Sequence, residues 1–394
     1  MVPVPRSHVR AVPHGDDAAV TAALSPFTAV DRFDQYLESL GPLRELIEDQ
    51  TITEIMVVGP HTIFAERGGH IEPTGLSFRD ENHLLDVIAV IVGSVGRRVD
   101  AHQPVCDARL LDGSRVAVSV PPVAVNGPLL TIRKFRKDPF GVQDLVRMGT
   151  LTEETAAMLE AAVSARANMI ISGGTGSGKT TLLNVCSGFI PSDERIVTIE
   201  DAAELRLHQP HVCTLEAQPA DPDGYGPVTI RDLVWHSLRM RPDRIVVGEC
   251  RGGEAFDMLQ AMSTGHDGSL STLHANSARD CVSRLETLVM MAGLDLPIRA
   301  IRQQISAAVD VIVQLERLRD GSRRVTSITE VVRMEGETVT MQDIFVLEVT
   351  GTGPDGRLRT ELRRTGVRSR IVDRLVERGL PVPEALAKVF PTRR

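Results

Sequence analysis

The sequence predicts an α/β protein in which a larger domain with a parallel-dominated β-sheet follows a smaller α+β domain. From about residue 152, short apolar runs alternate with helix-like segments, which is typical of a parallel sheet covered by helices. Before that, two helical segments precede several short strand-like runs, and Asp112-Gly113 between two of these runs is a strong hairpin signal. The length of 394 residues suits two or three domains.

Changes in composition along the chain place the domain boundaries. The first residues are rich in proline and have no apolar segment, so we expect a disordered arm and no signal peptide. The segment 136–141 is charged and then broken by proline and glycine, as linkers often are. The expected parts are a disordered arm (1–30), an α+β domain (31–135), a linker (136–150), an α/β domain (151–350) and a small helical appendage (351–394).

Hydrophobic periodicity predicts the individual elements. Helices are expected at 30–40, 42–49, 83–95 and 153–165, with a further one from residue 180. Strands are expected at 54–58, 62–66, 107–111, 115–120, 129–134, 169–171, 196–199, 245–247 and 270–273. The runs 309–315 and 326–332 would extend the second sheet.

Composition excludes several classes of protein. Lys and Arg number 44 against 52 Asp and Glu, a net charge of −8, and the chain has only 10 Phe, 2 Tyr and 1 Trp, which argues against a dedicated nucleic-acid binder. The 5 cysteines form no CxxC pair, so neither a zinc ribbon nor a disulfide framework is expected. The longest apolar run, 87–92, is too short for a membrane span. We therefore expect a cytoplasmic protein that reaches a membrane only through partners.

A phosphate-binding pattern stands between a predicted strand and a predicted helix. Residues 173–180 read GGTGSGKT and fit GxxxxGK[ST]. Its glycines let backbone N–H groups surround a β-phosphate, Lys179 can reach the β and γ oxygens, and Thr180 can hold Mg²⁺. The pattern predicts binding of ATP or GTP rather than an incidental glycine-rich turn. The predicted nucleotide-binding residues are Gly173, Gly174, Thr175, Gly176, Ser177, Gly178, Lys179, Thr180 and Thr181.

Acidic residues follow two of the predicted strands. Glu200 and Asp201 come after the run 196–199, and Glu249 comes after 245–247. In a parallel sheet both strand ends open on the edge that carries the phosphate-binding loop. A carboxylate there can orient a water or hold Mg²⁺, and the candidate metal ligands are Thr180, Glu200 and Asp201. The alternative is that these acids only cap the helices that follow.

Two histidines and two arginines complete the candidate site. His266 and His274 flank the run 270–273, where a histidine can sense a phosphate or bridge to an acid, although a lone histidine is more often structural. Arg115 and Arg133 lie on strands of the first domain. Arginines there are ordinarily solvated, but an arginine finger for phosphoryl transfer can come from another domain or subunit. The pattern alone does not select between these roles.

Taken together, these residues resemble the secretion ATPase superfamily, the motors of type II and type IV secretion and of type IV pili. The chain is most similar to the CpaF-type ATPases of Tad/Flp pilus systems. The absence of a tetracysteine motif favours that branch or the type IV secretion branch. The segments that carry the resemblance are 53–57, 107–116, 131–135, 173–180, 199–205, 239–249 and 264–277.

The resemblance implies a fold, a reaction and partners. It implies a RecA-like ATPase domain behind a mobile N-terminal domain, in a homo-hexamer that hydrolyses ATP with Mg²⁺ and docks on an inner-membrane platform protein. Glu200 and Asp201 would belong to the Asp box, Glu249 to the Walker B strand, and His266 and His274 to the His box. Arg115 and Arg133 would reach the γ-phosphate.

Several functions remain open at this point. The favoured one is a motor that powers assembly, and possible retraction, of a Tad/Flp-type pilus at the inner face of the cytoplasmic membrane. The alternatives are a type IV secretion traffic ATPase exporting protein or DNA, a nucleic-acid translocase, and a nucleotide-gated scaffold with little turnover.

Overall fold

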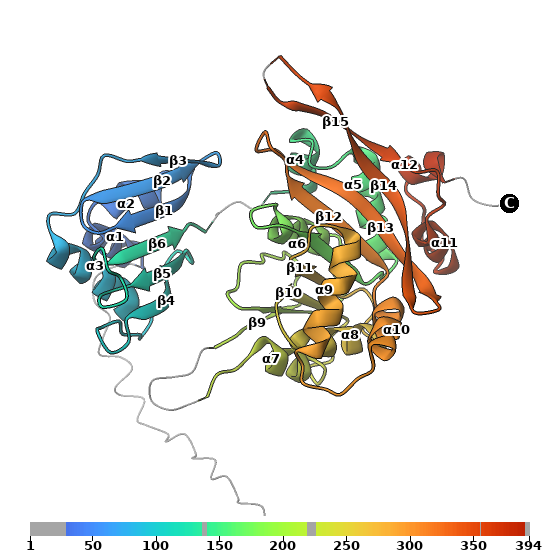
Figure 1. Ribbon diagram of the computed structural model, residues 1–394, viewed down its shortest axis with the longest axis horizontal. Helices are drawn as coiled ribbons and strands as arrows, with labels where there is room; N and C mark the ends of the chain where they lie inside the picture. The colour runs from blue at the N-terminus through green and yellow to red at the C-terminus, as the bar shows by residue number, and fades with distance from the viewer. Residues whose placement is uncertain (1–28, 136–139, 219–225, 355, 391–394) are drawn as a thin grey trace, which may run out of the picture. The chain divides into compact units, whose positions relative to one another are not determined.

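The computed structural model describes residues 29–135, 140–218, 226–354 and 356–390. The chain divides into two compact units, an N-terminal unit (Met1–Arg136) and a C-terminal unit (Lys137–Arg394), each with its own sheet (Figure 1). Residues 1–28, most of the expected disordered arm, lie outside the described residues. In the part of the chain that the structure describes, no helix is long and apolar enough to cross a membrane.

The N-terminal unit is a six-stranded antiparallel sheet in the order β3-β2-β1-β6-β5-β4. One strand, β3, is an element that the sequence did not predict. The elements are α1 (Ala29–Ser39), α2 (Leu43–Glu48), β1 (Ile52–Val58), β2 (Thr62–Arg67), β3 (His70–Pro73), α3 (Glu81–Gly93), β4 (Val105–Arg109), β5 (Arg115–Ser119) and β6 (Leu129–Arg133).

Alternating apolar residues give this sheet one buried face. Ile55 and Val57 of β1 and Leu130 and Ile132 of β6 pack in one core with the apolar side chains of the three helices. The residues between them on the strands point to the opposite face, because side chains alternate along a strand. That opposite face carries many of the unit's polar strand residues.

The C-terminal unit has a nine-stranded sheet in the order β15-β14-β13-β12-β7-β11-β10-β8-β9. The strands from β12 to β9 pair in parallel, and β13, β14 and β15 add antiparallel pairs at one side. The expected parallel-dominated α/β fold is confirmed. The strands are β7 (Met169–Gly173), β8 (Ile196–Glu200), β9 (Val212–Glu216), β10 (Arg244–Cys250), β11 (Leu270–Leu273), β12 (Val311–Arg317), β13 (Arg323–Glu335), β14 (Thr338–Thr352) and β15 (Leu358–Arg364).

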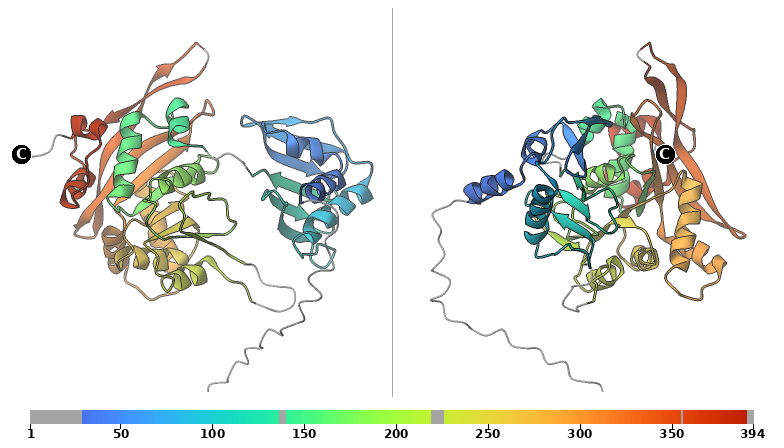
Figure 2. Two further views of the ribbon diagram at one scale, coloured as in Figure 1. Left: turned by 180° about the vertical axis from the view of Figure 1, so that it is seen from behind. Right: turned by 60° about the vertical axis from the view of Figure 1, so that its left-hand side comes forward.

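Helices cover both faces of the parallel part of this sheet (Figure 2). In β7, Met169 and Ile171 pack into one core with α5, α6, α11 and α12, whereas Ile170 packs into a second core with α7, α8, α9 and α10. This alternation explains why such strands are apolar on successive residues. The helices are α4 (Val142–Arg147), α5 (Glu153–Ser164), α6 (Lys179–Ser187), α7 (Ile230–Ser237), α8 (Glu254–Ser263), α9 (Ala278–Met290), α10 (Ile298–Ala308), α11 (Arg370–Glu377) and α12 (Glu384–Val389).

Two expectations about segment boundaries differ from the structure. The expected linker 136–150 contains α4, and its buried Leu145 packs into the core of the C-terminal unit. The expectation of a purely helical appendage from residue 351 is wrong in part, because β14 runs to Thr352 and β15 follows it before α11 and α12. β15 lies at the edge of the sheet, where charged residues discourage further strand pairing, so its sequence lacks the apolar signal of a buried strand.

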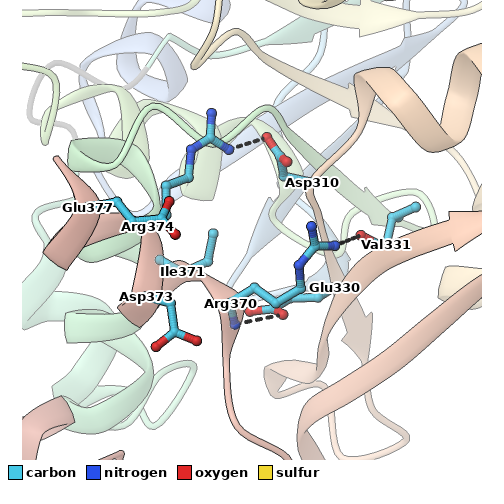
Figure 3. A pocket seen from close by; sticks show the side chains of 8 residues that line it. All are labelled: Asp310, Glu330, Val331, Arg370, Ile371, Asp373, Arg374 and Glu377. Atoms are coloured by element: carbon cyan, nitrogen blue, oxygen red, sulfur yellow. Dashed lines mark hydrogen bonds and ion pairs between the residues drawn. The ribbon is translucent and has the colours of Figure 1, made fainter. Parts of the chain in front are cut away.

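A pocket of about 400 Å³ opens where α11 packs beside the beginning of β12 and the middle of β13 (Figure 3). Arg374 Nη1 donates to Asp310 Oδ2 over 2.8 Å, and the buried Glu330 carboxylate accepts from Ser369 Oγ and from the Arg370 amide. These contacts fasten α11 to the sheet. The pocket lies at the edge where β12 begins, opposite the edge where β7 ends. Its lining residues are Asp310, Glu330, Val331, Arg370, Ile371, Asp373, Arg374 and Glu377.

Candidate active site

The phosphate-binding loop joins β7 to α6, as the sequence predicts. Gly178 precedes the first residue of α6 with φ 100°, a left-handed conformation that glycine adopts without strain. Three donors converge on the carbonyl of Gly174: Lys179 Nζ at 3.0 Å, Ser177 Oγ at 2.9 Å and the Ser177 amide at 3.4 Å. Such donors at the start of a helix can turn to the oxygens of a phosphate.

His274 and Glu249 meet the loop lysine at the carboxyl ends of β11 and β10. Lys179 Nζ lies 3.2 Å from His274 Nε2, and that same nitrogen lies 3.0 Å from Glu249 Oε1. Thr272 Oγ1 donates to the Gly248 carbonyl over 2.7 Å and ties the two strand ends together. These distances bear out the sequence prediction for the strand that ends at Glu249, and the strand that ends at Glu200 runs parallel beside it.

The protonation of His274 decides what Glu249 can do. Burial, followed by the positive charge of Lys179, lowers the pKa of His274, so its ring is neutral near pH 7. When the neutral ring of His274 accepts a hydrogen bond from Lys179 at Nε2, that nitrogen carries no proton to donate to Glu249. Consistently, the buried Oε1 of Glu249 accepts no hydrogen bond from any residue that the structure describes. A buried carboxylate oxygen of this kind is suited to a water or a ligand.

Arg251 holds the other oxygen of Glu249. Its Nη2 donates to Glu249 Oε2 over 2.8 Å, and its Nη1 donates to Asp201 Oδ2 over 3.2 Å. The hydrogen bond to Glu249 is the largest of the effects that raise the pKa of Arg251. The sequence did not predict a role for Arg251. The available signal was its position two residues after Glu249, which places both side chains on one side of an extended chain.

Glu200 is buried and organises the loop that follows β8. Its Oε1 accepts from the amides of Glu204 and Leu205 at 3.0 and 3.1 Å. A Cβ at Gly248 would lie 2.9 Å from Glu200 Cγ, so the neighbouring strand needs glycine there to admit the carboxyl group. Burial is the largest influence on this group and raises the pKa of Glu200 to about 7. A carboxyl with that pKa can exchange a proton at neutral pH.

The raised pKa of Glu200 predicts a pH-dependent stability. Between about pH 4.5 and about pH 7 the folded protein keeps a proton on Glu200 that the unfolded chain loses, so the free energy of unfolding falls as pH rises, by an amount on the order of 3 kcal/mol. Glu200→Gln keeps an acceptor for the two amides and stays neutral. We expect the variant to gain stability relative to wild type between about pH 5 and about pH 7.5 in urea unfolding. A difference between the two proteins that does not change with pH would contradict this.

The residues expected to hold Mg²⁺ are not equivalent. Thr180 lies in the first turn of α6, where its hydroxyl can reach an ion on the bound phosphates. Asp201 is exposed, whereas Glu200 is buried and bonded to backbone amides. Across the described residues, no group of three or more His, Cys, Asp or Glu side chains could hold a metal. Thr180, with phosphate oxygens and water, fits the usual incomplete protein shell of Mg²⁺ better than Glu200 does.

The structure does not bring His266 to this cluster. His266 precedes β11, and its carbonyl accepts from Ser269 Oγ; that loop is bonded to Asn168, which precedes β7. Because β7 and β11 are parallel, His266 lies at the edge opposite to the one where His274 follows β11. Its predicted site role is therefore not supported within this unit, and the reason is that the two histidines are at opposite ends of one strand.

Arg115 and Arg133 face the same way in the N-terminal unit. They are directly paired between β5 and β6, and Arg133 is in turn paired with Glu54 of β1, with 3.9 Å between its Nε and the carboxylate. Arg109 of β4 is paired with Arg115, which extends the row of arginines. Directly opposite residues share one face of a sheet. The sequence identified two members of this row but not Arg109, whose place opposite Arg115 depends on the register of the β4–β5 hairpin.

The family model described as type II/IV secretion system protein matches residues 36–363. The chain belongs to this family. The match spans both units, so the family resemblance inferred from the sequence motifs is confirmed at this level.

Named members of the family are similar over most of their length. A putative conjugal transfer protein of Mycobacterium tuberculosis is 38% identical over 306 residues, which cover 76% of this chain and 86% of that protein. The type IV secretion system protein VirB11 of Brucella suis is 33% identical over 313 residues, covering 72% and 87%. The solved structure of the ATPase DotB of Legionella pneumophila has 21% identity, covers 77% of this chain and 80% of that chain, and superimposes with a TM-score of 0.52, a likeness of fold alone.

Proposed function

We propose that this member of the family is an ATP-hydrolysing motor that works as a homo-hexamer and powers assembly of a Tad/Flp-type pilus. The observation that carries the hydrolytic part is the buried Oε1 of Glu249 beside His274 and Lys179. It is an acceptor with no hydrogen bond among the described residues, at the edge of a phosphate-binding loop. A scaffold that only binds nucleotide has no need of such a group.

Each residue of the cluster has a role in the proposed reaction. The loop amides and Lys179 bind the β and γ phosphates, and Glu249 takes the proton of the attacking water. Arg251 positions Glu249 by holding its second oxygen, and His274 stays neutral between the lysine and the acid. Thr180 would hold Mg²⁺, which neutralises phosphate charge when bound.

The cargo of the motor has two candidates. The motif combination that resembles CpaF-type ATPases supports a pilus, with an inner-membrane platform protein as the partner that receives the work. The relatives named as conjugal transfer and VirB11 proteins support a type IV secretion traffic ATPase, which exports protein or DNA. Pilin and prepilin-peptidase genes next to this gene would support the pilus; conjugation genes would support secretion.

The ring mechanism is tested by measuring ATP turnover per subunit against protein concentration. Light scattering on the same samples gives the oligomeric state. We expect turnover per subunit to rise at the concentrations where a hexamer forms, because neighbouring subunits would complete each other's sites. Lys179→Ala is the control and should show no concentration-dependent turnover, since the loop lysine is lost. A monomer that hydrolyses ATP equally fast at every concentration would mean that the ring proposal is wrong.

A further inference from the structure

The hairpin formed by β12 and β13 reaches the phosphate-binding loop from within the same unit. β12 runs parallel to β7, and their pairing continues to Leu315 opposite Gly173, the residue at which the loop begins. The hairpin turn, residues 318–322, therefore lies beyond the end of β7, on the side of the loop. At the end of the loop, a Cβ on Gly178 would lie 3.9 Å from Leu315 Cδ2 of β12. Figure 1 shows the β12–β13 hairpin at the antiparallel side of the sheet.

Two arginines at the end of this hairpin contact the loop. Arg317 and Arg323 are directly paired across the two strands, so both side chains are on one face of the hairpin. Arg323 Nε donates to the Gly176 carbonyl over 2.8 Å. Arg317 Nη1 lies 3.9 Å from the point that a Cβ on Gly176 would occupy. Both guanidinium groups thus stand at the same loop residue.

The turn that carries these arginines is itself held in place. Asp320 Oδ1 accepts from the amide and the hydroxyl of Ser322, and its Oδ2 accepts from the Leu358 amide over 2.7 Å. The Ser322 hydroxyl is the largest of the contacts that lower the pKa of Asp320 to about 2, so it stays ionised. The turn is thereby tied to the start of β15. These hydrogen bonds restrict the conformation of the turn and so fix where Arg317 and Arg323 lie beside the loop.

Holding the Gly176 carbonyl also fixes the direction of the next amide. In a trans peptide the C=O of one residue and the N–H of the next point in opposite directions. When Arg323 holds the Gly176 oxygen on the hairpin side, the Ser177 N–H is directed away from the hairpin, toward the inside of the loop. There it makes a long 3.4 Å hydrogen bond to Gly174 O, which a phosphate oxygen can replace.

We infer that the β12–β13 hairpin is part of the nucleotide site: Arg323 positions the phosphate-binding loop, and Arg317 places a second positive charge beside it. This inference rests on the proposed function. The role of Arg323 differs from that of Glu249. Arg323 holds the loop in the shape that binds the phosphates of ADP and ATP in the ground state, whereas Glu249 acts on the attacking water. Loss of Arg323 should therefore raise the dissociation constant and KM and leave kcat nearly unchanged.

The test compares three arginines of one hairpin. We expect Arg323→Ala to weaken binding of ADP and ATP about 10-fold, the effect typical of losing a hydrogen bond to a charged group. Arg317→Ala should weaken it about 3-fold, and this smaller effect should fade as salt is added, because it is a charge effect. Arg319→Ala is the matched control, since Arg319 contacts Thr352 instead of the loop, and it should bind as wild type does.

Measurements of stability and of turnover show whether Arg323 positions the loop or only stabilises the fold. At saturating ATP, kcat of Arg323→Ala should stay within about 3-fold of wild type, and thermal unfolding without nucleotide should be unchanged. If the alanine variant unfolds early, Arg323→Lys carries the test: it keeps the charge but not the Nε donor, so weaker binding is again expected. If Arg323→Ala and Arg323→Lys both bind nucleotide with wild-type affinity, this inference is wrong and the proposed function still stands. A wild-type protein that binds neither nucleotide would overturn the proposed function with it.

Discussion

Glu249→Gln is expected to lower ATP turnover by about 100-fold or more while ATP affinity stays within a few-fold of wild type. Glutamine has nearly the same shape as glutamate and can still accept from Arg251 through its amide oxygen. It cannot take a proton from the attacking water. The loss should therefore appear in kcat, because binding depends on the loop and Lys179. Steady-state turnover and equilibrium binding of ATP measure the two effects separately.

A neighbouring acid provides the control for this variant. Glu254 lies in the first turn of α8, and its Oε1 accepts from the amide of Gly252 at 2.8 Å, so it holds the backbone turn that precedes the helix. Glu254→Gln should reduce stability slightly and leave kcat unchanged. Equal losses of turnover in both variants would mean that Glu249 also has only a structural role. Turnover retained in Glu249→Gln would favour the nucleotide-gated scaffold.

The parts of the fold that were predictable are those with local signals. β7, the loop and α6 were predicted together because a buried apolar strand, glycines and a helix follow one another without interruption. β15 was missed because a charged edge strand has no apolar pattern and is defined by its pairing with β14. α4 was assigned to a linker because its burial depends mainly on one residue, Leu145.

The site divides in the same way. Glu249 and His274 were predictable because each follows a strand of a parallel sheet, and topology alone brings such ends together. The prediction for His266 was wrong, because His266 precedes β11 and therefore lies at the opposite edge of the sheet. Arg251 and Arg323 act through contacts with Glu249 and Gly176. The position of Arg251 two residues after Glu249 was the one signal for it, and no spacing in the sequence distinguishes Arg323 from other solvated arginines.

Loss of Arg115 or Arg133 is expected to lower turnover by about 100-fold or more, with a smaller change in ATP affinity. An arginine finger stabilises charge that develops in the transition state, so its removal acts mainly on kcat. The two side chains lie in one row on one face of the sheet, which suits a shared target. Arg98→Ala is the control, because its side chain is 76% exposed and pairs with Asp100 elsewhere in the unit. Losses of affinity as large as the losses of kcat would contradict the finger role.

Mixed rings decide whether these arginines act on a neighbouring subunit. Arg133→Ala and Lys179→Ala subunits should each be inactive alone, and they carry complementary defects. If the arginine of one subunit serves the loop of the next, random mixing in equal amounts gives about a quarter of the interfaces both an intact lysine and an intact arginine, and activity should return in that proportion. If it serves its own loop, no mixture contains an intact site. Recovery would therefore identify a site shared between subunits, and its absence in rings shown to exchange subunits would assign each site to a single chain.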